Sequence, residues 1–401
     1  MKKKSILMIV ENCFPGDPRV RKEAEVLKTH YRIVVIALKK MKWEKCYEVH
    51  NDITILRMPE FPSLQLGKVR YIMEYLYFTL CSAALFLGSH LFFRYKVIHV
   101  HNPPDTLFFV GSLGKIFGVK FVYDHHDLSP ELYLTRFTDK KDLIYKTMIF
   151  FEKLSCKLAN AIICTNESYK RIEMTRHGVK ENKIFIVRNN PIIDECSLTN
   201  SRKNSSGNTI DKKILLFLGS INPQDGLDTL LHILHYLVNE LNRKDFVCNI
   251  VGDGDSLDSL KTLASKLGLE AFVDFKGFVS DREKIREYLS SSDIGLEPAP
   301  ENELNKHSTF IKIMEYMAAA KPIVAFDLVE TRFSADSSAI LIPPGDLGGF
   351  ARAIQKLLDE PALRDELGRK GLQRVSQELT WGKASKNLND AYKSIFPRDY
   401  N

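Results

Sequence analysis

The feature that most constrains the fold is a repeated alternation of short apolar runs with helical segments, interrupted once by a polar stretch. Apolar runs at 5–10, 32–37 and 97–100 each lead into a polar or turn-rich segment, and a second series begins at 213–219. Residues 197–211, between the two series, are rich in Ser, Asn and Lys, which is typical of a linker. Strands that alternate with helices form parallel sheets covered on both faces, so the sequence predicts two doubly wound α/β domains.

The 401 residues are enough for two or three domains of ordinary size. We expect an N-terminal Rossmann-like domain over 1–196, the linker over 197–211 and a second Rossmann-like domain over 212–375. A last helical segment over 376–401 is expected to cross back to the first domain. Two such domains would face each other across a cleft, which is the default place for a ligand.

Composition limits the classes of partner. With 44% hydrophobic residues, 27% charged residues and a net charge of +7, the chain is ordinary for a globular protein and only mildly basic. Lysine runs at 2–4, 39–45 and 140–141 are usually solvated faces, although they also suit an anionic membrane surface. No nucleic-acid-binding signature is present, so no nucleic-acid partner is expected. The seven cysteines form no Cys-x-x-Cys pair, which indicates reduced thiols and a cytoplasmic protein.

The stretch Tyr75–Phe93 contains no charged residue and is long enough to be a candidate membrane span. Polar residues inside it and the strand that follows at 97–100 favour instead a helix buried in, or lying on, the first domain. Docking of this helix on a membrane stays open as an alternative, and a true span is the least favoured reading. The expected location is therefore cytoplasmic, with contact at the inner face of the cell membrane as the alternative.

Residues 292–325 read as strand, loop, helix and strand. Ser308 and Thr309 are good N-cap residues for a helix over 310–320. The free N–H groups and the dipole at such a helix start can bind a phosphate or diphosphate, and Glu315 on the same helix could accept two ribose hydroxyls. A purely structural cap and a partly exposed Glu without a ligand are equally compatible with this pattern.

Polar clusters follow two strands of the first domain, at 101–105 and at 124–131. We interpret them as the wall of an active site, with structural capping or a metal site as alternatives. No defined spacing of zinc ligands is present, so no metal is expected. In the second domain, Gly252-Asp-Gly254 lacks the third glycine of a dinucleotide fingerprint, which argues against a nicotinamide site.

Several motifs occur in the order seen in one family. These are Asp17-Pro-Arg-Val-Arg-Lys-Glu23, His126-Asp127, Gln224-Asp-Gly226, Val251-Gly-Asp-Gly254, Ser292-Asp-Ile-Gly295 and Lys312-Ile-Met-Glu-Tyr-Met-Ala-Ala-Ala-Lys-Pro-Ile-Val324. Over essentially its whole length the chain resembles the family 4 glycosyltransferases of the GT-B fold. Asn102-Pro-Pro-Asp and Asp124-His-His-Asp-Leu resemble a bacterial and archaeal branch that builds cell-surface polysaccharides.

The resemblance implies a retaining, metal-independent enzyme of the hexosyltransferase type that needs no cofactor. Its substrates would be a UDP- or GDP-sugar, held mainly by the second domain, and a glycan or lipid-linked acceptor at the first domain. Carried over by position, Glu315 would hold the donor ribose, the backbone of 308–310 the diphosphate, and His126 the donor sugar. The implied catalytic residues are His126 and Glu315, the acceptor side is Asn102, Asp105 and Asp127, and the donor side is Gly16, Gly219, Gln224, Gly252, Ser308, Thr309, Phe310, Lys312 and Glu315.

The chain also departs from the family pattern. His307 stands where a second Glu is often found, and Ser220 and Gln224 occupy a loop that often carries Arg and Lys. The missing cations could be replaced by Lys306, Lys312 or Arg188. Two alternatives to a transferase therefore stay open: a catalytically silent GT-B subunit that binds or scaffolds, and a sugar-nucleotide epimerase on the same fold.

Overall fold

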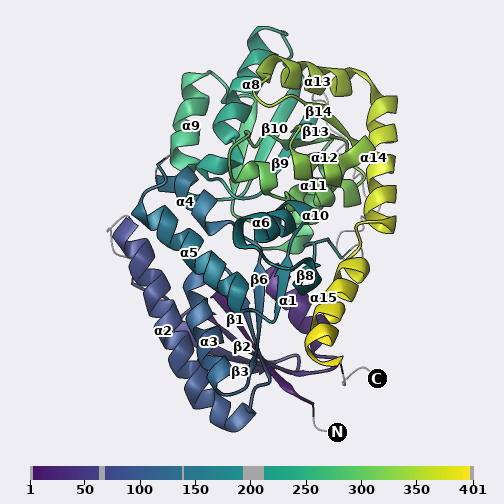
Figure 1. The fold of residues 1–401 in the computed structure, drawn as a ribbon. Helices are drawn as coiled ribbons and strands as arrows, with labels where there is room; N and C mark the ends of the chain where they lie inside the picture. The colour runs from purple at the N-terminus through teal and green to yellow at the C-terminus, as the bar shows by residue number, and fades with distance from the viewer. Residues whose placement is uncertain (1–2, 63–67, 138–139, 193–211, 398–401) are drawn as a thin grey trace. The chain divides into compact units, whose positions relative to one another are not determined.

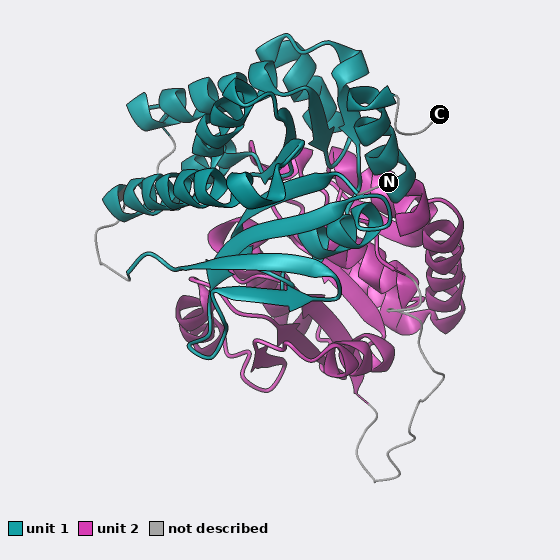
Figure 2. Cartoon of the chain, turned by 90° about the horizontal axis from the view of Figure 1, so that it is seen from below, with its two compact units in different colours: residues 1–189, 384–401 teal, residues 190–383 magenta. Residues whose placement is uncertain are grey.

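The computed structural model of the protein describes residues 3–62, 68–137, 140–192 and 212–397 (Figure 1). The chain divides into two compact units, unit 1 with residues 1–189 and 384–401 and unit 2 with residues 190–383 (Figure 2). The last helix, α15 (Trp381–Ile395), falls in unit 1 from Ala384 on. The linker predicted at 197–211 lies outside the described residues.

Unit 1 is built on an eight-stranded sheet with the order β3-β4-β2-β1-β5-β6-β7-β8, parallel except for the β3–β4 pair. Strand β1 lies between β2 and β5, so the direction of the strand order reverses there. The strands are β1 (Ser5–Cys13), β2 (Arg32–Lys39), β3 (Tyr47–His50), β4 (Ile53–Pro59), β5 (Val97–His101), β6 (Lys120–His125), β7 (Ala161–Cys164) and β8 (Ile184–Ile186).

Helices cover both faces of this sheet. Because parallel crossovers are right-handed, α2 (Lys68–Phe93), α3 (Phe108–Ile116), α5 (Leu143–Leu158) and α6 (Glu167–His177) lie on one face and α1 (Pro18–Leu27) on the other. This cover buries the central strands on both sides, so Ile6 to Ile9 are fully buried and read as a continuous apolar run. The remaining short elements are α4 (Ser129–Phe137) and the 3-10 turns η1 (Asp105–Leu107) and η2 (Glu181–Lys183).

Two sequence features of unit 1 can be compared directly with the structure. The pair Asp17-Pro18 predicts a helix cap followed by the first helical residue. In the structure Asp17 caps α1 by accepting from the backbone N–H of Arg19 and Val20, and Pro18 is the first helical residue. The edge strand β3 was not predicted, because its four residues are largely exposed and carry no apolar run.

Unit 2 is built on a six-stranded parallel sheet with the order β11-β10-β9-β12-β13-β14. Its strands are β9 (Lys213–Leu218), β10 (Phe246–Val251), β11 (Val273–Gly277), β12 (Ile294–Glu297), β13 (Ile323–Phe326) and β14 (Ala339–Ile342). Its helices are α8 (Leu227–Asn239), α9 (Leu257–Lys266), α10 (Arg282–Ser291), α11 (Ile311–Ala318), α12 (Val329–Ala335), α13 (Leu347–Asp359) and α14 (Pro361–Gln377), with 3-10 turns η3 (Pro223–Asp225), η4 (Asn305–His307) and η5 (Asp336–Ser338). The order reverses between β9 and β12, where doubly wound sheets bind ligands.

The predicted start of α11 was wrong in detail. The N-cap is Phe310, which makes no side-chain capping bond, and the first helical residue is Ile311. The hydroxyl of Ser308 instead donates to the carbonyl of Leu304 at 2.9 Å, because Ser308 terminates the preceding turn η4. Neither Ser308 nor Thr309 is therefore the cap residue.

Candidate active site

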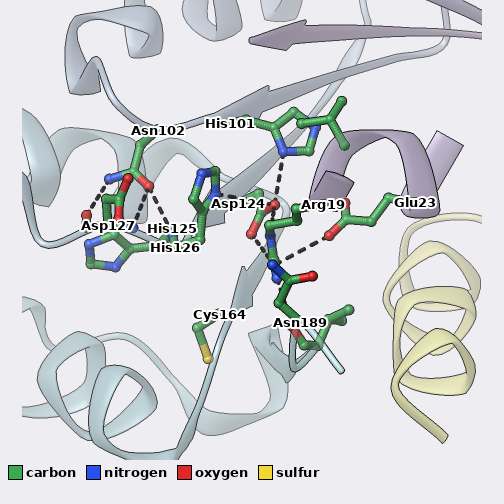
Figure 3. Close-up of polar contacts among 12 residues, drawn as sticks. Arg19, Glu23, His101, Asn102, Asp124, His125, His126, Asp127, Cys164 and Asn189 are labelled. Atoms are coloured by element: carbon green, nitrogen blue, oxygen red, sulfur yellow. Dashed lines mark hydrogen bonds and ion pairs between the residues drawn. The ribbon is translucent and has the colours of Figure 1, made fainter. Parts of the chain in front are cut away.

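A buried ion pair organises the carboxyl ends of the unit 1 strands (Figure 3). Arg19 of α1 donates through two nitrogens to the Asp124 carboxylate at the end of β6, at 2.8 and 2.6 Å, and also to the carbonyl of Val187 at 2.9 Å. Burial alone would raise the pKa of Asp124, but the Arg19 guanidinium holds it well below its usual range. Asp124 is therefore a fixed negative charge beneath the predicted His126 site.

Asp124 and three buried side chains around the pair, Glu23, His99 and His101, have the chemistry of metal ligands, with ligand atoms within 4.8 Å of one another. His101 Nδ1 lies 2.9 Å from Asp124, and Arg19 lies 3.3 Å from the Glu23 carboxylate. The guanidinium already supplies positive charge among the two carboxylates, so an ion-pair network is the simpler account of the cluster. Sequence reasoning missed this network, although Arg19 and Glu23 stand four apart on one helix face.

Asn102 clamps the backbone of the loop that carries His126 (Figure 3). Its side-chain oxygen accepts from the N–H groups of His126 and Asp127 at 2.8 and 3.2 Å. Its side-chain nitrogen donates to the carbonyl of Asp127 at 2.6 Å and to Asp105 at 3.2 Å. Because all four bonds join Asn102 to other groups of the protein and Asn102 is 1% exposed, this side chain holds the His126 loop in place from inside the domain.

The other two predicted acceptor-side residues differ in exposure. Asp105 is buried and accepts from the Tyr123 hydroxyl, and burial followed by the charge of Glu152 raises its pKa to about 6. Asp127 is exposed. Of the three acceptor-side residues, Asp127 is therefore the one whose side chain can meet a ligand directly.

His126 and Gly16 also lie at this end of the sheet. His126 Nδ1 is 3.5 Å from Asp124, and the nearby carboxylate outweighs the effect of burial and raises the pKa of His126. A Cβ added to Gly16 would stand 2.4 Å from the Cys13 sulfur, so the packing of its own loop excludes a side chain there.

Glu11, near the carboxyl end of β1, was not selected from the sequence. Burial, followed by the charge of Glu74 on α2, raises the pKa of Glu11 to about 9. Tyr71 and Tyr75, on the same part of α2, hydrogen-bond to each other. The available signal was an acidic residue directly after a fully apolar strand, which is unusual unless the carboxyl group has a role.

In unit 2, the loops after β9 and β10 touch through two glycines. Gly219 has φ 147° and Gly252 has φ 152°, and a Cβ added to Gly252 would stand 1.7 Å from the Gly219 carbonyl oxygen. Only glycine fits both the backbone conformation and this close approach. The two predicted donor-side glycines therefore form one surface at the carboxyl end of the sheet.

Lys312, in the first turn of α11, is held beside this surface. Its Nζ lies 3.0 Å from Glu297 Oε2 and 4.1 Å from the centroid of the Phe217 ring. A Cβ on Gly219 would meet Lys312 Cε at 3.0 Å, so the helix start and the β9 loop are in contact. Glu315 follows on the same helix and is half-buried. Glu297 was missed from the sequence, although an acid that ends a buried strand must be either neutral or paired with a cation.

The remaining predicted donor-side residues lie in neighbouring turns. Gln224 is in η3, and its backbone carbonyl accepts from the Asn305 side chain of η4 at 2.8 Å. Lys306, one of the candidate replacement cations, pairs with Glu303 at 2.6 Å. The structure thus brings the β9 loop, η3, η4 and the start of α11 together at one end of the unit 2 sheet.

Comparison with known families shows to which family these two units belong. The family described as "Glycosyltransferase Family 4" matches residues 42–189, and the family described as "Glycosyl transferases group 1" matches residues 212–360. Together the two matches cover most of the chain and both units. The chain belongs to the family 4 type of glycosyltransferase. The prediction made from the order of its motifs is confirmed.

Individual relatives are distant. An uncharacterized glycosyltransferase of Methanocaldococcus jannaschii is 24% identical over 309 residues, which are 75% of either chain. The lipopolysaccharide core biosynthesis glycosyltransferase LpsD of Rhizobium meliloti is 30% identical over 151 residues, 37% of this glycosyltransferase and 40% of LpsD.

Solved structures establish the fold of the glycosyltransferase. Sucrose-phosphate synthase from Thermosynechococcus elongatus matches with a TM-score of 0.82 at 19% identity, over 98% of this chain and 100% of the synthase. Anabaena HepE, solved in complex with UDP-glucose, matches with a TM-score of 0.74 at 16% identity, over 97% and 99% of the two chains. The predicted GT-B fold with two Rossmann-like α/β units is confirmed.

Proposed function

We propose that this glycosyltransferase moves a hexose from a UDP- or GDP-sugar to a glycan or lipid-linked acceptor in the synthesis of a cell-surface polysaccharide, with retention at the anomeric carbon and without a metal or other cofactor. The observation that carries the proposal is the start of α11, where Lys312 and the Gly219 loop are packed together and Glu315 follows on the same helix. HepE, with the same fold, was solved with UDP-glucose, which supports a nucleotide-sugar donor. The relative LpsD acts in lipopolysaccharide core synthesis, which supports a cell-surface product.

The groups proposed for the donor site suit the chemistry of the leaving diphosphate. Transfer passes through an oxocarbenium-like state while negative charge grows on the leaving diphosphate. The N–H groups at the start of α11, from Ile311 on, and the Lys312 ammonium can stabilise that charge, whereas the N–H of Ser308 already donates to the carbonyl of Asn305 at 3.1 Å. Glu315, further along the helix, would then accept the two ribose hydroxyls.

On the acceptor side, Asn102 fixes the loop that presents His126 and Asp127. Although burial opposes it, the Asp124 carboxylate raises the pKa of His126, and the imidazolium form of His126 can donate to a sugar hydroxyl or a developing charge. Asp127 is exposed and can bind an acceptor hydroxyl. Asn102 and Asp105 would position this surface from beneath.

The test is turnover with radiolabelled UDP- and GDP-hexoses, with a lipid and glycan extract of a bacterial cell envelope as acceptor. We expect label in the acceptor fraction with one donor, an unchanged anomeric configuration in the product, and the same rate in EDTA. Glu315→Ala should lower kcat/KM about 100-fold or more, because two hydrogen bonds to a carboxylate are lost. Inversion, a need for metal, or near-normal turnover of Glu315→Ala would each contradict the corresponding part of the proposal.

Because His307, Ser220 and Gln224 depart from the family pattern, the same experiment also tests the two alternatives, a silent binding subunit and a sugar-nucleotide epimerase. A silent binding subunit would bind nucleotide but transfer nothing from any donor. An epimerase would change the donor sugar in the absence of acceptor, which product analysis without acceptor detects.

A further inference from the structure

Helix α2 carries an exposed apolar stripe along its length. From Val69 onward every exposed side chain of the helix is apolar, and Leu80 and Phe92 are 61% and 84% exposed. Most of the positions are separated by three, four or seven residues, so these share one side of the helix. We call this stripe the α2 face; it consists of Val69, Ile72, Met73, Leu76, Leu80, Leu87, Leu91 and Phe92.

The opposite side of α2 is fixed to unit 1. Phe78, Ser82 and Phe86 are buried at intervals of four residues, and the hydroxyls of Thr79 and Thr106 are 2.7 Å apart. By length and composition the segment Val69–Phe93 could cross a membrane, with 22% of its most apolar window buried. Because its inner side belongs to the core of unit 1, the helix can lie on a membrane while remaining part of the domain.

Neighbouring helices extend the apolar surface. Helix α3 packs between α2 and α5 on one face of the sheet (Figure 1). Helix α3 exposes Ile116, which is 79% exposed, and α5 exposes Leu143, also 79% exposed, together with Phe150. Exposed apolar side chains gathered on neighbouring helices are a feature of docking sites.

Positive charge accompanies this surface. Of the eleven exposed ionisable side chains described between residues 69 and 158, ten are Lys or Arg and the other is Asp127. On α5, Lys146, Lys153 and Lys157 alternate with Leu143 and Phe150 at helical spacing and are exposed with them. The partner must therefore be apolar and anionic at once.

A basic pocket of about 1080 Å³ continues the α2 face at its C-terminal end. Leu91 and Phe92 belong both to the α2 face and to the lining of the pocket. The charged residues of the lining are six cations and the acid Asp52; the cations are Lys3, Lys4, Lys28, Arg32, Arg94 and Lys96. Such a cluster beside apolar side chains suits the phosphate of a lipid headgroup.

We propose that the α2 face docks on the surface of an anionic phospholipid bilayer, with phosphate headgroups in the basic pocket. A second copy of the chain is a poorer occupant, because a symmetric dimer would bring two cationic surfaces together. A bilayer supplies apolar chains for the leucines and, at the adjacent headgroup level, phosphate charges for the cations. This inference does not depend on the identity of the transferred sugar.

The test is flotation of the purified full chain with vesicles of phosphatidylcholine alone and of phosphatidylcholine mixed equally with phosphatidylglycerol. We expect binding to the anionic vesicles only. Leu80→Gln/Leu87→Gln/Leu91→Gln and Arg32→Gln/Arg94→Gln/Lys96→Gln should each lower the partition coefficient on the order of tenfold or more. The matched controls are Phe278→Gln, an exposed apolar residue of unit 2, and Lys261→Gln/Lys266→Gln/Lys284→Gln, three exposed lysines of unit 2.

Because all altered side chains are exposed, unchanged circular dichroism and melting temperature will show that the variants are folded. Absence of flotation with anionic vesicles, or equal loss in the controls, would overturn the proposal. So would a concentration-dependent dimer that the leucine variant abolishes while vesicles remain unbound. Protein that resists extraction by high salt and alkaline carbonate would point instead to insertion of α2.

Discussion

Lys312 Nζ lies 3.0 Å from Glu297 Oε2, and the two side chains are 8% and 2% exposed. The pair joins the first turn of α11 to the end of β12. It holds a cation in place at the helix start that we propose for the donor diphosphate. Burial raises the pKa of Glu297 and Lys312 opposes that rise, so the charge of the Glu297 carboxylate depends on the lysine.

Removing only one member of this pair should destabilise unit 2. We expect Lys312→Met to lower the free energy of unfolding by about 3 kcal/mol, because it leaves a buried carboxylate without its cation. An acid whose folded pKa is raised loses stability as pH increases, so the loss should be larger at pH 8 than at pH 5. Lys312→Met/Glu297→Gln should recover part of it in urea titrations, and equal losses for the single and double variants would contradict the coupling.

The same double variant separates a structural role of Lys312 from a role in transfer. With both charges removed and the fold retained, kcat/KM should still fall about tenfold or more if the ammonium stabilises the leaving diphosphate. As a control, Lys370→Met/Glu366→Gln removes a surface pair of α14 and should leave activity unchanged. Normal turnover in the Lys312 double variant would limit this lysine to a structural role.

Glu11 should make stability depend on pH in an unusual direction. Its folded pKa of about 9 exceeds the ordinary value of 4.5, so the folded state binds the extra proton between these values and stability falls as pH rises. Glu11→Gln should remove this cost and stabilise unit 1 at pH 7 by up to about 3 kcal/mol. Thermal unfolding from pH 5 to pH 9 measures it; parallel curves for the two proteins would show that Glu11 does not bind this proton.

Gly295 and Tyr316 explain why the Ser292-Asp-Ile-Gly295 motif ends in glycine. A Cβ on Gly295 would stand 2.5 Å from the Tyr316 ring, whose hydroxyl accepts from the N–H of Leu218 at 3.0 Å and donates to the carbonyl of Leu216 at 3.1 Å. Gly295→Ala should cost about 1–3 kcal/mol through overpacking. In a Tyr316→Ala background the same change should cost little, and an undiminished cost there would locate the strain elsewhere.

Asn102 should act as a positioning residue for the His126 loop. Asn102→Ala removes the clamp and should lower the free energy of unfolding by about 2 kcal/mol and kcat by about tenfold. Asn160→Ala is the matched control, since Asn160 accepts one backbone N–H, from Phe121 at 2.9 Å, at the opposite end of the sheet. A similar loss of kcat in both variants would mean that general destabilisation, and not loop position, limits turnover.

What the sequence predicted, and what it missed, follows from the range of the interactions. The buried strands and the Asp17 cap of α1 are local patterns, and they were read correctly. The predicted start of α11 was wrong because no strong sequence pattern marks the turn η4, in which the Ser308 hydroxyl bonds to the carbonyl of Leu304. Arg19 and Asp124 are 105 residues apart, so no pattern in the sequence states that they pair. The same holds for Glu297 and the α11 lysine, which meet only because β12 and α11 pack together.

The most direct test of the central claim is a thermal-shift measurement with UDP, GDP, ADP, CMP and NAD on the wild-type protein and on Glu315→Ala. A ligand that binds only the folded state raises the melting temperature, and at about 100 times its Kd it adds about 2.7 kcal/mol. We predict a clear shift with UDP or GDP that is lost in Glu315→Ala, and none with CMP or NAD. No shift with any nucleoside diphosphate, or a shift that survives in Glu315→Ala, would contradict a donor site at α11.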